Sequence, residues 1–240
     1  MIRRTVAFAL LAASLTSACG VILGEQGSGV IVTRRFELPA QVQRIELGDA
    51  FRGTITIGAM KPSAEVAIDD NLVDRLRVEI DGDTVAVDVK GRVRDATLRV
   101  ALGVIRLREL RLSGASRASV AGGLGLTDDV TVEGSGASEI RLASVDLDEF
   151  DITLSGASEL SGATGSANRI TADVSGASSL SLLGVEADEV HVDVSGASRA
   201  SVTARDRLEA SASGASSVVY QGDPDHVTRD ESGASSIEPA

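Results

Sequence analysis

Residues 150–160 read FDITLSGASEL, residues 170–180 read ITADVSGASSL, and residues 190–200 read VHVDVSGASRA. The shared word SGAS occurs seven times in the chain, with successive spacings of 22, 20, 20, 20, 18 and 19 residues. Its copies begin at Ser113, Ser135, Ser155, Ser175, Ser195, Ser213 and Ser232. Self-similarity at a nearly fixed period predicts a repeat architecture, in which each unit packs against the next.

Apolar and polar residues alternate on both sides of the word. Five, three and one residues before it stand Phe150, Ile152, Leu154; Ile170, Ala172, Val174; Val190, Val192, Val194; and Leu208, Ala210, Ala212. The positions between them are polar, and alternation with period two is typical of a strand with one buried face. After the word it resumes, as at Leu180 and Leu182, and a third, weaker stretch such as Val185-Glu186-Ala187 leads into the next unit.

Each unit therefore contains two clear strands and one short strand. A strand rises about 3.3 Å per residue, so about twenty residues travel once around a small closed coil. Stacking such coils pairs equivalent strands in parallel and buries the alternating positions as columns. The sequence predicts an all-β fold, a parallel β-solenoid with SGAS repeats of about 20 residues.

The SGAS word is interpreted as a corner between two strands. Small residues suit a corner, and glycine adopts backbone angles that other residues avoid. Strict alternation would carry the inward set from Leu154 through Gly156 and Ser158 to Leu160. The alternative is a serine nucleophile, but a catalytic residue has no reason to recur seven times. The predicted corner glycines are Gly114, Gly136, Gly156, Gly176, Gly196, Gly214 and Gly233.

The first residues have the order of an export signal. Arg3 and Arg4 precede a short apolar run, and the segment ends in LTSACG, where Cys19 is the only cysteine of the chain. This order predicts a signal peptide over residues 1–18 and lipidation of Cys19, as in a bacterial lipoprotein. Ordinary signal cleavage after Ala18 is the alternative. Gly20 in the next position favours the outer membrane if the cell has one.

The predicted domains follow from these segments. Residues 19–29 form a short tether, and residues 30–240 form a single solenoid domain. Within it, residues 30–105 are a strand-rich N-terminal part, and residues 106–240 contain the SGAS repeats.

Composition excludes several classes of function. The formal net charge is −12, which repels phosphate backbones and argues against nucleic-acid binding. The chain has no Trp, one Tyr and four Phe, so a carbohydrate cleft built on aromatic platforms has almost no material.

Few residues are candidates for other chemistry. Asp173 and Asp193 fall in one outward column and would lie about 4.8 Å apart, which makes them weak candidates for a Ca²⁺ site. A solvated acidic stripe is the preferred interpretation. His191 is expected to be a surface residue, and Asp69-Asp70-Asn71 is expected to form a turn or a helix cap. No catalytic residue, metal site or cofactor is predicted.

The segments before the repeats carry a family resemblance. RIELG at 44–48, TITIG at 54–58, DDNL at 69–72 and EIDGDTV at 79–85, followed by the SGAS tracts, resemble the bacterial head GIN domain family of autotransporter adhesins. The resemblance covers nearly everything after residue 29. It implies a right-handed parallel β-helix, often on an envelope lipoprotein, and it supplies no catalytic residues.

Two classes of function are consistent with these observations. The first is a non-catalytic envelope lipoprotein, an adhesin or scaffold that presents an acidic solenoid surface to an unidentified envelope or extracellular ligand. The alternative is a polysaccharide-active β-helix enzyme, a lyase or glycosidase, which would need a pocket that gathers carboxylates and arginine from several coils. We predict no enzymatic activity.

The last repeat departs from the pattern of the others. Its inward positions are Val227, Arg229 and Glu231, so two inward columns become charged. This predicts a C-terminal cap that blunts the open strand edge, with self-association at the solenoid end as the alternative.

Overall fold

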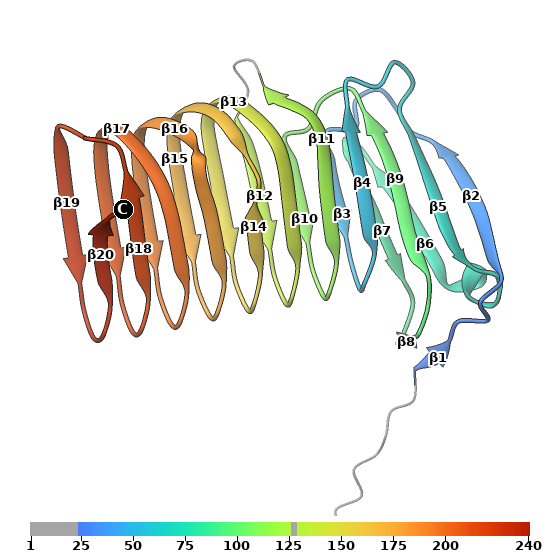
Figure 1. Ribbon diagram of the computed structural model, residues 1–240. Helices are drawn as coiled ribbons and strands as arrows, with labels where there is room; N and C mark the ends of the chain where they lie inside the picture. The colour runs from blue at the N-terminus through green and yellow to red at the C-terminus, as the bar shows by residue number, and fades with distance from the viewer. Residues whose placement is uncertain (1–23, 126–128) are drawn as a thin grey trace, which may run out of the picture.

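The computed structural model describes residues 24–125 and 129–240. A pair formed by β1 (Glu25–Gln26) and β8 (Val93–Arg94) lies apart, and eighteen other strands form one continuous sheet. From β10 onward every pairing is parallel, and equivalent strands stack coil upon coil (Figure 1). The predicted parallel β-solenoid is confirmed.

The repeats contribute eleven strands, of which the longest bend around the coil and serve two of its sides. We call the outward surface of the strands entering each SGAS turn face A, that of the strands leaving it face B, and the remaining part of each coil the third side. The strands are β10 (Glu109–Leu112), β11 (Arg117–Gly125), β12 (Val130–Gly134), β13 (Glu139–Leu154), β14 (Glu159–Ser161), β15 (Thr164–Val174), β16 (Ser179–Val194), β17 (Arg199–Ala212), β18 (Ser217–Gln221), β19 (His226–Glu231) and β20 (Ser236–Pro239).

The core consists of inward columns that run along the solenoid. Phe150 lies in register with Ile170, and Ile170 with Val190, each on the adjacent strand. These residues are buried, as are the columns of Ile152 and Leu154 beside them. The alternation of apolar and polar residues therefore predicted the buried face of these strands correctly.

The SGAS turn differs from strict alternation at one point. The last serine of each turn is buried in six of the seven copies, but the glycine and the alanine are exposed. The prediction that Gly156 and its equivalents point inward is wrong, because the seven glycines have positive φ, from 71 to 80°, and turn the chain outward for three residues. Successive turns are joined by hydrogen bonds such as that from Ala177 N to Gly156 O, 2.7 Å.

The buried serine hydroxyls find partners inside the turns. Ser158 Oγ donates to Ser155 O at 2.8 Å, and Ser178 Oγ donates to Ser175 O at the same distance. Ser138 Oγ donates to Ser158 Oγ, 3.1 Å away in the next turn. Buried hydroxyls that are satisfied in this way stabilise the corner and explain the word without any catalytic role.

The coils before the repeats do not stack in chain order. The coil of β3 (Arg44–Leu47) and β4 (Arg52–Ile57) lies between the first SGAS coil and the coil of β7 (Thr84–Val89) and β9 (Leu98–Val104). Asp49 takes the place of the turn glycine with φ of 58°, and its Oδ2 accepts a hydrogen bond from Val89 N at 2.8 Å.

Antiparallel strands cover the N-terminal end of the solenoid. Strand β5 (Ser63–Asp69) pairs with β9 and β2 (Ile31–Glu37), and β6 (Leu76–Asp81) pairs with β7. The 3₁₀-helix η1 (Asp70–Arg75) joins β5 to β6. The sequence predicts a turn or a helix cap at residues 69–71. The side chain of Asp69 makes no capping hydrogen bond to η1. It is buried and accepts hydrogen bonds from Gly29 N and Thr97 N, both 2.6 Å.

The C-terminal end carries polar side chains over the last core residues. All six residues of β19 are exposed. Arg229 lies over the Tyr220 ring, 5.0 Å from its centroid, and donates to its hydroxyl, while Glu231 Oε1 accepts from Ile237 N at 3.0 Å. Strand β19 pairs only with β17 among the described strands, so its outer edge has no partner there.

Candidate functional site

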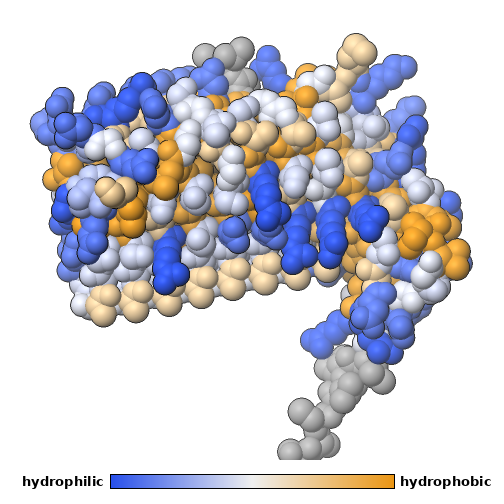
Figure 2. All heavy atoms as spheres, viewed as in Figure 1, coloured by the Kyte–Doolittle hydropathy of each residue, from blue (hydrophilic) through white to orange (hydrophobic). Residues whose placement is uncertain are grey.

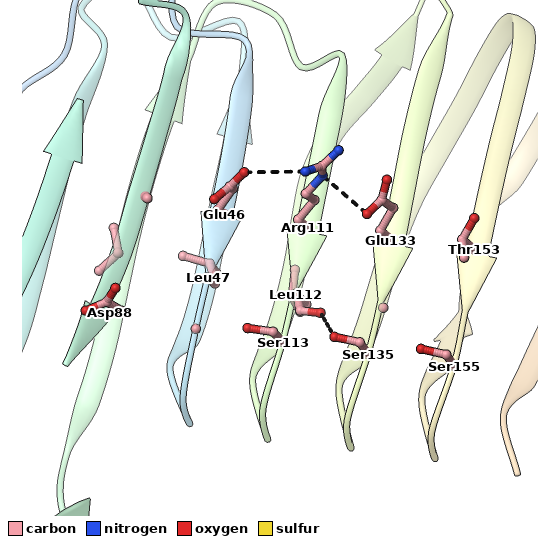
Figure 3. A pocket seen from close by; sticks show the side chains of 14 residues that line it. Glu46, Leu47, Asp88, Arg111, Leu112, Ser113, Glu133, Ser135, Thr153 and Ser155 are labelled. Carbon is pink, nitrogen blue, oxygen red and sulfur yellow. Dashed lines mark hydrogen bonds and ion pairs between the residues drawn. The ribbon is translucent and has the colours of Figure 1, made fainter. Parts of the chain in front are cut away.

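A groove on face A gathers charged side chains from several coils. It has a volume of about 360 Å³ and runs across β7, β3, β10, β12 and the end of β13 (Figure 3). One border carries Glu46, Arg111, Glu133 and Thr153, and the other carries Asp88, Ser113, Ser135 and Ser155. The three serines on the second border belong to SGAS turns, and their small side chains leave the hollow open.

Arg111 is the cation at the centre of this groove. It lies in register with Glu46 on one side and with Glu133 on the other. Its guanidinium approaches Glu46 at 3.8 Å and Glu133 at 3.2 Å (Figure 3). It also pairs with Glu109 on its own strand. All these side chains are partly exposed, so each pair adds little stability, but together they hold the arginine in a ladder of alternating charge.

Asp88 is the unusual carboxylate of the groove. Burial raises the pKa of its carboxyl group, Arg77 opposes this effect, and Asp49 and Glu79 add to it. Its Oδ1 atom is shielded and accepts no hydrogen bond, and Arg77 Nε lies 3.9 Å away. The side chain as a whole is 42% exposed, so solvent still screens the charge.

The weak metal candidates lie in a second hollow on the same face. Asp173 and Asp193 are in register on β15 and β16 and line a space of about 210 Å³ together with Asp230 and turn serines. His191, exposed as predicted, lies 3.3 Å from Asp193 and 3.4 Å from Glu209. No group of three or more potential metal ligands occurs in residues 24–125 and 129–240.

The other predicted site residues are distributed differently. The seven turn glycines form one column along the edge between faces A and B, beside exposed alanines. The row of weakly hydrophobic residues at the lower edge of the molecule in Figure 2 marks this edge. Cys19 lies outside the described residues. Within the part of the chain that the structure covers, no helix is long and apolar enough to cross a membrane.

Sequence reasoning missed the groove around Arg111 and the arginines of face B. Their alignment depends on the coils before the repeats, which contain no SGAS word. The signal that was available is the alternation in RIEL at 44–47 and in ELRL at 109–112, which have the same parity. Nothing in the sequence shows that these two segments lie side by side.

Comparisons with known proteins agree with the fold. The family model described as "Putative auto-transporter adhesin, head GIN domain" matches residues 42–224. A solved structure of a putative adhesin from Bacteroides fragilis is 18% identical, with a TM-score of 0.81 over 90% of this chain and 100% of that chain.

Two solved structures from Parabacteroides distasonis are also similar. One, of a putative adhesin, is 19% identical, with a TM-score of 0.76 over 90% of this chain and 100% of that chain. The other, of a putative lipid binding protein, is 20% identical, with a TM-score of 0.68 over 90% and 98%. A search of curated proteins found no match. At these identities the likeness shows the fold alone.

Proposed function

Since the chain belongs to the head GIN domain family of auto-transporter adhesins, we propose that it is a non-catalytic binding module of the cell envelope, an adhesin or scaffold. The observation that carries the proposal is the solenoid itself. Its outward columns repeat coil after coil, so both faces present regular rows of polar side chains to an extended partner.

The groove on face A is the feature that the enzyme alternative requires, because it gathers carboxylates and an arginine from several coils. Glycoside hydrolysis needs an acid and a base on opposite sides of the scissile bond, with room for substrate between them. The backbones of Glu46 and Glu133 are two strand spacings apart, about 9 to 10 Å. Arg111 fills that interval and pairs with both carboxylates, which favours binding over catalysis.

We further propose that the chain is exported and held at the membrane, in the outer membrane where one exists, through a lipid on Cys19. The first described strand, β1, pairs with β8 at the N-terminal end of the solenoid (Figure 1), so a lipid on Cys19 would leave the SGAS end pointing away from the membrane. A similar protein named as lipid binding is compatible with this location. The acidic rows of face A would then be accessible to an envelope or extracellular ligand.

The proposal is tested by capture from envelope extract. The intact protein and a soluble form that begins at residue 24 are immobilised, and retained material is compared with that on an unrelated acidic protein. We expect both forms to retain the same envelope component. Retention by neither form overturns the binding function.

The lipid anchor is tested separately. Labelling of cells with a palmitate analogue should tag the wild type and not the Cys19→Ser variant. Equal labelling of the two proteins contradicts lipidation at Cys19 and favours ordinary signal cleavage.

A further inference from the structure

Three arginines lie in one row on face B. Arg99 on β9 is in register with Arg52 on β4, and Arg52 is in register with Arg117 on β11. Adjacent strands are about 4.8 Å apart, so the three side chains follow a straight line along the solenoid axis. All three are exposed. Like charges directly opposed on neighbouring strands are unfavourable, and the fold gains nothing from them.

Two other arginines of the chain lie between carboxylates on the neighbouring strands. Arg169 lies between Glu149 and Glu189, at 3.3 and 2.9 Å, as Arg111 lies between Glu46 and Glu133. In the arginine row Arg117 has such a partner, Glu139 at 2.8 Å.

The other two arginines of the row have no counter-charge within the part of the chain that the structure describes. Among the described residues no ion pair or side-chain hydrogen bond engages Arg52 or Arg99, and the residue beyond Arg99 in the row is Ala67. The chain has 35 acidic and 23 basic residues, so a shortage of carboxylates does not explain why Arg52 and Arg99 lack a partner.

The row stands between two hollows. One, of about 450 Å³, is lined by the three arginines together with Arg141, Thr54 and Ser119. Its one carboxylate, Glu65, is paired with Arg35. The other, of about 390 Å³, lies toward the turn edge and is lined by small residues such as Ala50 and Ala96. The guanidinium groups are therefore reachable from both sides.

Beyond Arg117 the column of the arginine row continues with Glu139 and Glu159, which end the cationic stretch. Hydroxyl groups lie beside the row, because Thr54 and Ser119 are in register in the neighbouring column and line the same hollow as the arginines. These hydroxyls can both donate and accept hydrogen bonds, as sugar hydroxyls do. Cations in a line with hydroxyls beside them match a polymer that carries carboxylates and hydroxyls.

We propose that face B binds a linear carboxylated polysaccharide along the solenoid axis, with its carboxylates on Arg99, Arg52 and Arg117. A guanidinium fork holds a carboxylate by two parallel hydrogen bonds. The inference rests on the proposed binding function and names the ligand class of one face. Acids elsewhere on the chain set a long-range repulsion that short-range pairing at the row must exceed.

The test is titration calorimetry of the full chain with an oligogalacturonate of defined length. The same oligomer with its carboxylates methyl-esterified is the matched neutral probe. We expect the acid form to bind and the ester to bind at least about tenfold more weakly, with affinity falling as salt is added. Equal binding of both probes, or binding of neither, overturns the inference.

The residues are tested with the double variant Arg52→Gln/Arg99→Gln and the control Arg199→Gln. Arg199 is exposed in the same column but is separated from the row by Glu139, Glu159 and Ser179. The double variant should lose at least about tenfold in affinity, the control should bind as the wild type does, and all three should melt alike. A double variant that binds normally overturns the assignment. Wild-type protein that captures envelope material but no uronate oligomer overturns this inference and leaves the proposed function standing.

Discussion

The turn glycines allow two effects of substitution to be separated, the strain of a positive φ and the close approach of the next coil. Gly196 has φ of +78°, and a Cβ atom added there would lie 2.6 Å from Gly176 O in the coil beneath. Gly58 has nearly the same φ, +82°, but a Cβ atom there would meet nothing within 4 Å. Both are exposed, so Gly196→Ala and Gly58→Ala differ mainly in whether another coil is stacked against the residue.

The expected losses follow from these distances. A left-handed alanine costs about 1 to 2 kcal/mol, offset in part by the lower entropy of the unfolded chain. Gly58→Ala should therefore lower the free energy of unfolding by about 1 kcal/mol. In Gly196→Ala the coils must also move apart at the turn, which weakens the 2.8 Å hydrogen bond from Ala197 N to Gly176 O, worth about 1 kcal/mol. With the residual repulsion, the total should reach about 3 kcal/mol.

Urea melts followed by circular dichroism measure both variants against the wild type. Gly58→Ala is the control for backbone strain, and the difference between the two variants reports coil stacking at the turn. Losses that agree within about 0.5 kcal/mol would refute the reasoning, because they would mean that the close approach of the turns is relieved without cost.

Three further predictions concern the core, the end and the groove. Val192→Asp should destabilise the fold by several kcal/mol because it buries an unpaired carboxylate, whereas Asp193→Asn should change stability by less than about 0.5 kcal/mol in the same urea melts; comparable losses would contradict the strand parity. Deletion of residues 225–240 should leave a folded domain that self-associates with concentration in sedimentation; a monomeric product would contradict the cap. Burial raises the pKa of Asp88 above its ordinary value of 3.8, so ionisation of this carboxyl opposes folding at pH values above 3.8. Asp88→Asn should therefore raise the free energy of unfolding slightly at neutral pH and leave it unchanged below pH 3.8. An equal effect at both pH values would exclude titration of this group as the cause.

The repeats show how much of the fold can be predicted from the sequence. Alternation around each SGAS word placed Phe150, Val192 and their equivalents in the core, because period two and burial of one face are properties of a single strand. The outward glycine could not be obtained in this way. Alternation holds only while φ stays in the extended region, and a left-handed residue at the turn interrupts it.

The N-terminal part shows where the sequence is insufficient. The coil of β7 and β9 follows the coil of β3 and β4 in the chain but stacks on the side of it that faces away from the SGAS repeats. No repeated word marks this order. The row of Arg99, Arg52 and Arg117 exists only because of that stacking. Arg99 and Arg117 follow Arg52 by 47 and 65 positions in sequence and become its neighbours in the fold. Charge patterning along the chain cannot reveal this row.

The third side of each coil has a consequence for how the molecule tolerates change. The pairing between β16 and β17 shifts register between Ser181 and Glu186, and that between β11 and β13 shifts between Val120 and Gly123, both just after face B. Repeats of 18 to 22 residues therefore keep the turns and both faces aligned. Inserted or deleted residues on the third side change the contour of one edge and displace no side chain on face A or face B, so that edge can accept a grafted peptide while both faces keep their spacing.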